Sequence, residues 1–303
     1  MADTVSVPPS TVALATPRPR ARRVWRALLS NPATVFGGVV LAIILFLAVF
    51  GHFVTPMDPL QQDLTARYLP PFWQAGADPA HLFGTDQLGR DVLSRTIAGT
   101  RVSVTVGVGS VVMQMLIGVT VGLLAGYLGG WIDTAVSRIA DVLVSVPFLV
   151  LALAISAILG PGIQNTILVL GLVGWVSFAR LVRAETLSMR EREFVLAART
   201  SGRGSAAIMF NDVLPNVSGS IIVVGTLQLS QMIIAESSLS FLGLGVQPPG
   251  IAWGSMIAEG MSGLMVAAWV VAVPGVALMF TTVAVNLLGD GLRDQLDPKG
   301  RTR

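Results

Sequence analysis

The 303-residue chain is strongly apolar: 53% of its residues are hydrophobic and 12% are charged, a balance that excludes an ordinary soluble domain and indicates an integral membrane protein. Its net charge of +3 reflects arginines placed between uncharged runs, so we expect no nucleic-acid partner. No cysteine, two histidines and one lysine, Lys299, argue against a disulfide, a Cys/His metal site and a phosphate-binding GxxxxGK[ST] loop.

A proline- and arginine-rich arm over residues 1–32 opens the chain, and we expect it to be cytoplasmic and disordered. Six runs of about 17 or more residues follow with almost no charge, which is the length that a helix needs to cross a bilayer. They predict six transmembrane helices, at residues 33–54, 102–126, 142–159, 162–179, 217–244 and 264–288. The first of them, assigned to 33–55, is too long for a signal peptide and lacks a small-residue cleavage site, so we interpret it as a retained span.

The basic residues predict the orientation, because cytoplasmic loops carry an excess of lysine and arginine. With the N-terminus inside, every basic residue falls on the cytoplasmic side except Arg67, Arg90, Arg95 and Arg101. Both termini are then cytoplasmic, including a tail at 291–303. Residues 56–101 and 245–263 then lie outside. The expected fold class is an all-α membrane protein with six transmembrane helices in a lipid bilayer.

In the first outer loop, residues 81–101 are predicted to form an amphipathic helix on the membrane surface. Thr85 or Asp86 would cap its N-terminus, and apolar residues follow at helical spacing. Metal binding through His81, Asp86 and Asp91 is an alternative that the pattern does not favour.

Glycines and prolines mark special positions within the spans. Gly118, Gly122 and Gly126 recur every four residues, which leaves a bare stripe on one face of the second span. Tight helix packing is the favoured interpretation, and helix sliding during transport is the alternative. Pro147 and Pro274 are expected to bend the third and sixth spans, because proline removes a backbone hydrogen bond.

The fifth span carries polar residues where hydrocarbon is expected. Five of these polar residues fall on one arc of the helix: Thr226, Ser230, Glu236, Ser237 and Ser240. Since an ionisable side chain in a span rarely faces lipid, we hypothesise that this arc lines a translocation path. The alternative is that Glu236 is hydrogen-bonded to a neighbouring helix and never meets substrate.

Between the fourth and fifth predicted spans, residues 184–215 are charged and contain glycines. Helical periodicity runs from Ala184 through Arg199, and a second short helix is predicted from Ser205 to about Phe210, ended by Leu214 and Pro215. Two short helices joined by a glycine turn would form a rigid knob in the cytoplasm. An arginine-rich linker lying on anionic lipid is the alternative.

This segment resembles the EAA loop of binding-protein-dependent ABC importer permeases, since it carries Ala197-Ala198, Gly202 and Leu214-Pro215 at that motif's spacing. The strings LFGTDQLGRDVLSR (82–95), AESSLSFLGLGVQPP (235–249) and NLLGDGLRDQLDP (286–298) resemble the C-type permease of the peptide/nickel branch. Two positions depart from the motif. Leu196 stands where the family has Glu, and Asp212 where it usually has Ile, while Glu193 lies one turn earlier and could supply the carboxylate.

The resemblance implies a type I ABC importer permease of a bacterial inner membrane, with a five-helix core over 102–290. It also implies a B-type permease partner, two ATPase subunits that bind ATP and Mg, and an extracytoplasmic substrate-binding protein, with no cofactor on this chain. The residues implied to couple to the ATPases are Glu193, Phe194, Leu196, Ala197, Ala198, Arg199, Gly202, Leu214 and Pro215.

The implied function is half of a translocation path for dipeptides or oligopeptides. The same fold importing glutathione, nickel chelates or another small solute is one alternative. A secondary transporter or channel working alone is another, but the chain has no convincing internal repeat and one candidate intramembrane charge, Glu236. A membrane enzyme is disfavoured because His52 and His81 have no convincing nucleophile or paired ligand near them.

Overall fold

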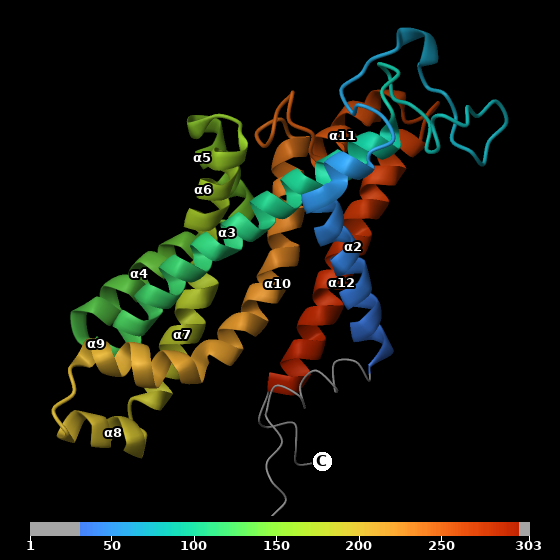
Figure 1. The fold of residues 1–303 in the computed structure, drawn as a ribbon. Helices are drawn as coiled ribbons and strands as arrows, with labels where there is room; N and C mark the ends of the chain where they lie inside the picture. The colour runs from blue at the N-terminus through green and yellow to red at the C-terminus, as the bar shows by residue number, and fades with distance from the viewer. Residues whose placement is uncertain (1–30, 297–303) are drawn as a thin grey trace, which may run out of the picture.

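The computed structural model describes residues 31–296, and over that range the chain is helical without a strand (Figure 1). Five helices of the described range are long and apolar enough to cross a membrane, and a pair of helices bent by 90° is a sixth candidate. The predicted all-α membrane fold is therefore confirmed for these residues. Most of the predicted N-terminal arm and the tail beyond residue 296 lie outside the described residues.

Helices α2 (Pro32–Val54) and α12 (Trp269–Leu296) pack against each other at one side of the bundle (Figure 1). The side chain of Asn31 accepts the Ala33 N–H at 3.0 Å and so caps α2. Helix α12 continues through Pro274 without interruption. It begins later than the apolar run suggests, because residues 264–268 form non-helical turns after the short 3₁₀ turn η3 (Met261–Gly263).

The centre of the molecule is α3 (Val92–Leu128), which packs against α6 (Ile163–Gly174), α7 (Val176–Met189) and α10 (Leu214–Phe241). Helices α6 and α7 together form one span of 27 residues. Leu170, Phe178 and Val182 on this span are fully buried in the main core. These contacts place the fourth predicted span, formed by α6 and α7, directly against the second, α3.

The third predicted span is sharply bent. Helix α4 (Gly130–Ser145) meets α5 (Phe148–Leu159) at 90°, with Val146 and Pro147 between them. The bend expected at Pro147 is therefore confirmed. Helix α5 has 12 residues, about 18 Å of helix, which is shorter than a bilayer core of about 30 Å. The helical conformation of residues 130–141 was not predicted, since their charges lie outside the apolar run.

The surface helix predicted for residues 81–101 is wrong in its first half. Asp86 does not cap a helix but accepts the Leu88 and Arg90 N–H groups at 2.9 and 3.0 Å, which fixes a turn containing Gly89 at φ +71°. Asp91 is the N-cap, accepting the Ser94 N–H at 2.7 Å. Helix α3 therefore starts at Val92, a fully buried residue, and runs inward as one helix.

The segment before the fifth span also differs from the prediction. Helix α7 ends at Met189, and α8 (Glu193–Thr200) starts after a break. Leu214 and Pro215 do not end a helix, because α9 (Ser205–Ile208), the π turn η2 (Met209–Val213) and α10 form one continuous 37-residue path. The π turn shifts the hydrogen-bond register, and Pro215 occupies the first turn of α10, where a missing N–H costs little.

Candidate functional site

Helices α8 and α9 and the π turn η2 form a knob, residues 193–213, at the same end of the bundle as the start of α2 and the end of α12 (Figure 1). Gly202 follows α8 with φ +79°, a left-handed conformation that favours glycine. Its N–H donates to the Arg199 carbonyl at 3.0 Å, and the Arg203 N–H donates to the Ala198 carbonyl at 3.1 Å. This pair of bonds is a Schellman motif. It fixes the direction in which the chain leaves α8.

Three arginines tie the knob to itself and to α3. Arg199 donates through Nε to the Tyr127 hydroxyl at 3.1 Å and lies 4.7 Å from the centre of that ring. Arg190 donates to a main-chain carbonyl near the end of α3 at 3.4 Å. Arg203 pairs with Asp212 at 2.8 Å across the turn. Asp212, which departs from the family motif, therefore closes the loop through an ion pair.

The knob presents apolar side chains to solvent. Val195 of α8 is buried, whereas Phe194 and Leu196 are 42% and 44% exposed, and Phe210 in the π turn is 55% exposed. Glu193, Ala197 and Arg199 are exposed on α8, Ala198 and Leu214 are half-buried, and Pro215 is exposed at the base of the knob. Exposed apolar side chains on a short, capped helix indicate a contact surface for another protein.

The glycine stripe of α3 lies against α7. A Cβ at Gly118 would come within 2.5 Å of the Trp175 carbonyl oxygen, and one at Gly122 within 2.7 Å of the Ala179 carbonyl oxygen. At Gly126 it would come within 2.8 Å of the Arg183 carbonyl oxygen. The absence of side chains lets the two backbones approach closely along three turns.

The five polar residues of the α10 arc point into the protein. Glu236 is fully buried and accepts hydrogen bonds from Ser103 of α3 at 3.0 Å and from Ser240 at 2.7 Å, with Ser237 at 3.4 Å. Ser230 donates to the Asn286 side chain of α12 at 2.7 Å. Thr226 is half-buried and donates to the carbonyl one turn earlier. This placement favours the alternative in which Glu236 joins helices without meeting substrate.

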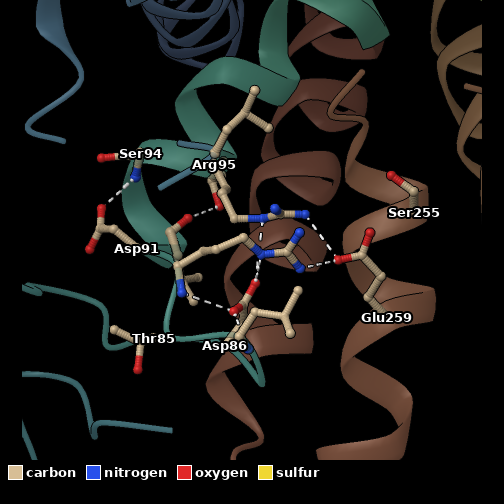
Figure 2. Close-up of polar contacts among 12 residues, drawn as sticks. Thr85, Asp86, Asp91, Ser94, Arg95, Ser255 and Glu259 are labelled. Carbon is tan, nitrogen blue, oxygen red and sulfur yellow. Dashed lines mark hydrogen bonds and ion pairs between the residues drawn. The ribbon is translucent and has the colours of Figure 1, made fainter. Parts of the chain in front are cut away.

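At the opposite end of the bundle, a largely buried ion network joins the loop between α2 and α3 to α11 (Trp253–Gly260) (Figure 2). Glu259 of α11 accepts from Arg90 at 2.5 Å and from Arg95 at 3.0 Å, and Asp86 accepts from Arg90 at 2.6 Å. The three carboxylate and imidazole groups considered for a metal do not converge, because His81 contacts Asp91 at 3.1 Å while Asp86 faces the arginines. Sequence reasoning missed both this network and α11.

We expect Glu259→Gln to lower the free energy of unfolding by about 2 kcal/mol, because two largely buried guanidinium groups would then share the single carboxylate of Asp86. Thermal unfolding of the detergent-purified chain measures the change. The matched control is Asp141→Asn, which breaks an exposed pair with Arg180 and should cost less than about 0.5 kcal/mol. Equal losses for the two variants would contradict a stabilising role for the network.

These features define a multi-pass integral membrane protein: apolar helices, one of them broken, with a knob at one end of the bundle. Comparison with known families makes the class specific. The family described as "Binding-protein-dependent transport system inner membrane component" matches residues 118–302, and the "N-terminal TM domain of oligopeptide transport permease C" matches residues 20–71. The chain belongs to the binding-protein-dependent transport system inner membrane component family.

Several curated proteins are similar along nearly their whole length. The di/tripeptide transport system permease protein DppC of Pseudomonas aeruginosa (strain UCBPP-PA14) is 40% identical over 97% of this chain and 97% of its own. The dipeptide transport system permease protein DppC of Escherichia coli (strain K12) is 42% identical over 91% and 92%. The glutathione transport system permease protein GsiD of Pectobacterium atrosepticum is 40% identical over 92% and 90%.

The comparisons decide between the functional alternatives left by the sequence. The chain is a permease subunit of an ABC importer and a multi-pass protein of the bacterial inner membrane. It is a transport subunit and not an enzyme, and a secondary transporter or channel acting alone is not supported.

Proposed function

We propose that this chain is one of two permease subunits in an importer of short peptides, paired with a B-type permease and served by two ATPase subunits and an extracytoplasmic binding protein. ATP and Mg would be held by the ATPase subunits. Support for a peptide cargo comes from relatives named for dipeptide and di/tripeptide transport. A relative named for glutathione transport supports short peptide-like solutes as the wider class.

The knob is the observation that carries the coupling part of this proposal. In the proposed orientation it lies in the cytoplasm, and the exposed apolar side chains of Phe194, Leu196 and Phe210 enter a cleft on an ATPase subunit. Leu196 makes that contact apolar where the family motif has a carboxylate, while Glu193 keeps a negative charge at the start of α8. The docking surface then lacks the carboxylate that the motif has at position 196.

Movement of the ATPases reaches the membrane through the attachments of the knob. Closure of the ATPase pair on ATP would move α8 as a rigid body, since its end is fixed by the Gly202 motif. The contact of Arg199 with Tyr127 passes that movement to α3, and the continuous helix from Ser205 passes it to α10. The transmembrane helices would thereby alternate between inward-open and outward-open states.

Purification of the complex in mild detergent, followed by reconstitution in vesicles, tests the proposal. We expect a second permease and two ATPases to co-purify with this chain, and uptake of a labelled dipeptide to require both ATP and the binding protein. Uptake driven by an ion gradient with no ATPase present would contradict it. Mass spectrometry of the material held by the binding protein then identifies the cargo.

A further inference from the structure

A cleft of about 590 Å³ opens between the α4–α5 bend, the α6–α7 junction and the middle of α10. Its size falls within the range of small-molecule sites in proteins, roughly 300 to 1,000 Å³. Val146 and Pro147 at the bend form one wall, Gly174 and Ser177 a second, and Gln231 and Ile234 of α10 a third. None of the five residues of the buried α10 arc lines it.

The cleft lies beside broken backbone. Within a bilayer, non-helical backbone is tolerated only where protein buries it or water reaches it, because hydrocarbon cannot accept or donate a hydrogen bond. Val146 and Pro147 interrupt the span between α4 and α5, and both border the cleft. In the single chain this break is therefore expected to face water or a polar occupant, and not lipid tails.

The α10 wall adds a polar side chain with no hydrogen-bond partner among residues 31–296. Gln231 is exposed, and its amide makes no hydrogen bond within the described residues, whereas its neighbour Ser230 is bonded to Asn286 on the other side of the helix. Gln228, one turn earlier and also lining the cleft, is held by Gln114 at 3.3 Å. An amide left in hydrocarbon without a hydrogen bond costs several kcal/mol, so Gln231 must face water or a polar occupant.

We propose that this cleft, with Gln231 as its hydrogen-bonding residue, is the part of the chain that contacts the peptide during translocation. This inference rests on the proposed function and moves the path from the Glu236 face of α10 to the face that bears Gln231 and Ile234. The amide of Gln231 can donate to a peptide carbonyl and accept from a peptide N–H, and Val146, Phe148 and Ile234 supply apolar surface for side chains. Arg180, a charged residue that also lines the cleft, is paired with Asp141 at 2.9 Å. The cleft therefore suits short peptides recognised chiefly through their backbone.

Single-cysteine labelling of the assembled importer tests the site, because the chain has no cysteine of its own. The variants are Gln231→Cys and, as the matched control one residue away, Ser230→Cys. The complex, with cysteines of the other subunits replaced, is placed in vesicles with its binding protein and exposed to a water-soluble maleimide. We expect Gln231→Cys to react about ten-fold faster than Ser230→Cys, because water-exposed thiols react and buried thiols do not. Loading the binding protein with dialanine and adding ATP should slow that reaction.

The labelling results distinguish a path that peptide uses from a surface covered by the partner permease or by lipid. Reaction of Gln231→Cys in the isolated chain but in no state of the complex would place the partner permease on this face and overturn the proposal. Absence of reaction in both would place lipid there and overturn it as well. Should Gln231→Cys fail to assemble, Ile234→Cys on the same wall replaces it. ATP-driven dialanine uptake by the parent complex is measured in parallel: its absence contradicts the proposed function, while normal uptake with unreactive Gln231→Cys contradicts the cleft alone.

Discussion

Gly118→Leu should remove most of the chain from the membrane. A Cβ at this position meets the Trp175 carbonyl oxygen at 2.5 Å and the Phe178 Cβ at 2.6 Å. A backbone oxygen cannot rotate away as a side chain can, so α7 would have to move off α3 and disturb the largest core cluster. We expect a loss of about 3 kcal/mol or more, enough to lower the steady-state amount of chain about ten-fold or more through proteolysis.

Gly38→Leu is the matched control, since a Cβ at Gly38 on α2 meets no atom within 4 Å. Immunoblots of membranes and the yield of monodisperse chain in detergent measure both variants. Near-normal amounts of Gly118→Leu would show that α3 and α7 separate easily, which is what the helix-sliding interpretation of the glycine stripe requires. Loss of Gly118→Leu with retention of Gly38→Leu supports permanent close packing.

The helices that could be predicted are those whose signal lies within one stretch of sequence. A helix needs about 20 consecutive apolar residues to cross a bilayer, and the sequences of α2 and α3 contain such runs. The glycine stripe and the bend at Pro147 are local in the same sense. Helix α4 was not predicted, because Asp133 and Asp141 interrupt its apolar residues. The structure pairs these two carboxylates with Arg183 and Arg180 of α7, partners that a local window does not contain.

The loop between α2 and α3 shows how a local signal can mislead. Asp86 followed by apolar residues at helical spacing has the pattern of an N-cap, yet Asp91 is the cap and Asp86 binds Arg90. What decides between the two aspartates is the ion network, and Glu259 is 169 residues from Arg90 in the chain. Asp86 contacts both Arg90 and Arg95, and it can do so from the turn but not from the start of the helix.

Which polar residues of α10 are left exposed could not be read from the sequence either. Both faces of this helix carry polar residues, and periodicity cannot say which polar group is satisfied by a neighbour. Ser230 is satisfied by Asn286 and Glu236 by Ser103, 56 and 133 residues away in the chain. Gln231 is left exposed. The glycine turn after α8, by contrast, was predictable because its signal is local, whereas the continuation of α9 into α10 was not.

Gly202→Val should leave the chain in the membrane but uncouple ATP hydrolysis from uptake. Gly202 has φ +79°, and a β-branched residue in this left-handed region is strained by about 1–2 kcal/mol or more. Relief of that strain breaks the two bonds that close α8, so Phe194 and Leu196 would no longer be held at a fixed angle to α10. Because no atom lies within 4 Å of a Cβ at Gly202, the fold of the membrane helices is unaffected. We expect ATP hydrolysis to continue while peptide uptake falls about ten-fold, a loss that corresponds to about 1.4 kcal/mol of coupling.

The control is two residues away. Gly204 has an ordinary extended conformation, φ −65° and ψ 148°, and a Cβ there also meets no atom within 4 Å. Gly204→Val should therefore transport normally, and Gly202→Asn, which tolerates the left-handed region better than valine, should fall between. Uptake and ATP hydrolysis are measured in the same vesicles at matched amounts of complex. If Gly202→Val imports peptide like the parent, a rigid α8 is not how the ATPases drive this permease; if Gly204→Val is equally defective, bulk against the ATPase and not backbone strain is responsible.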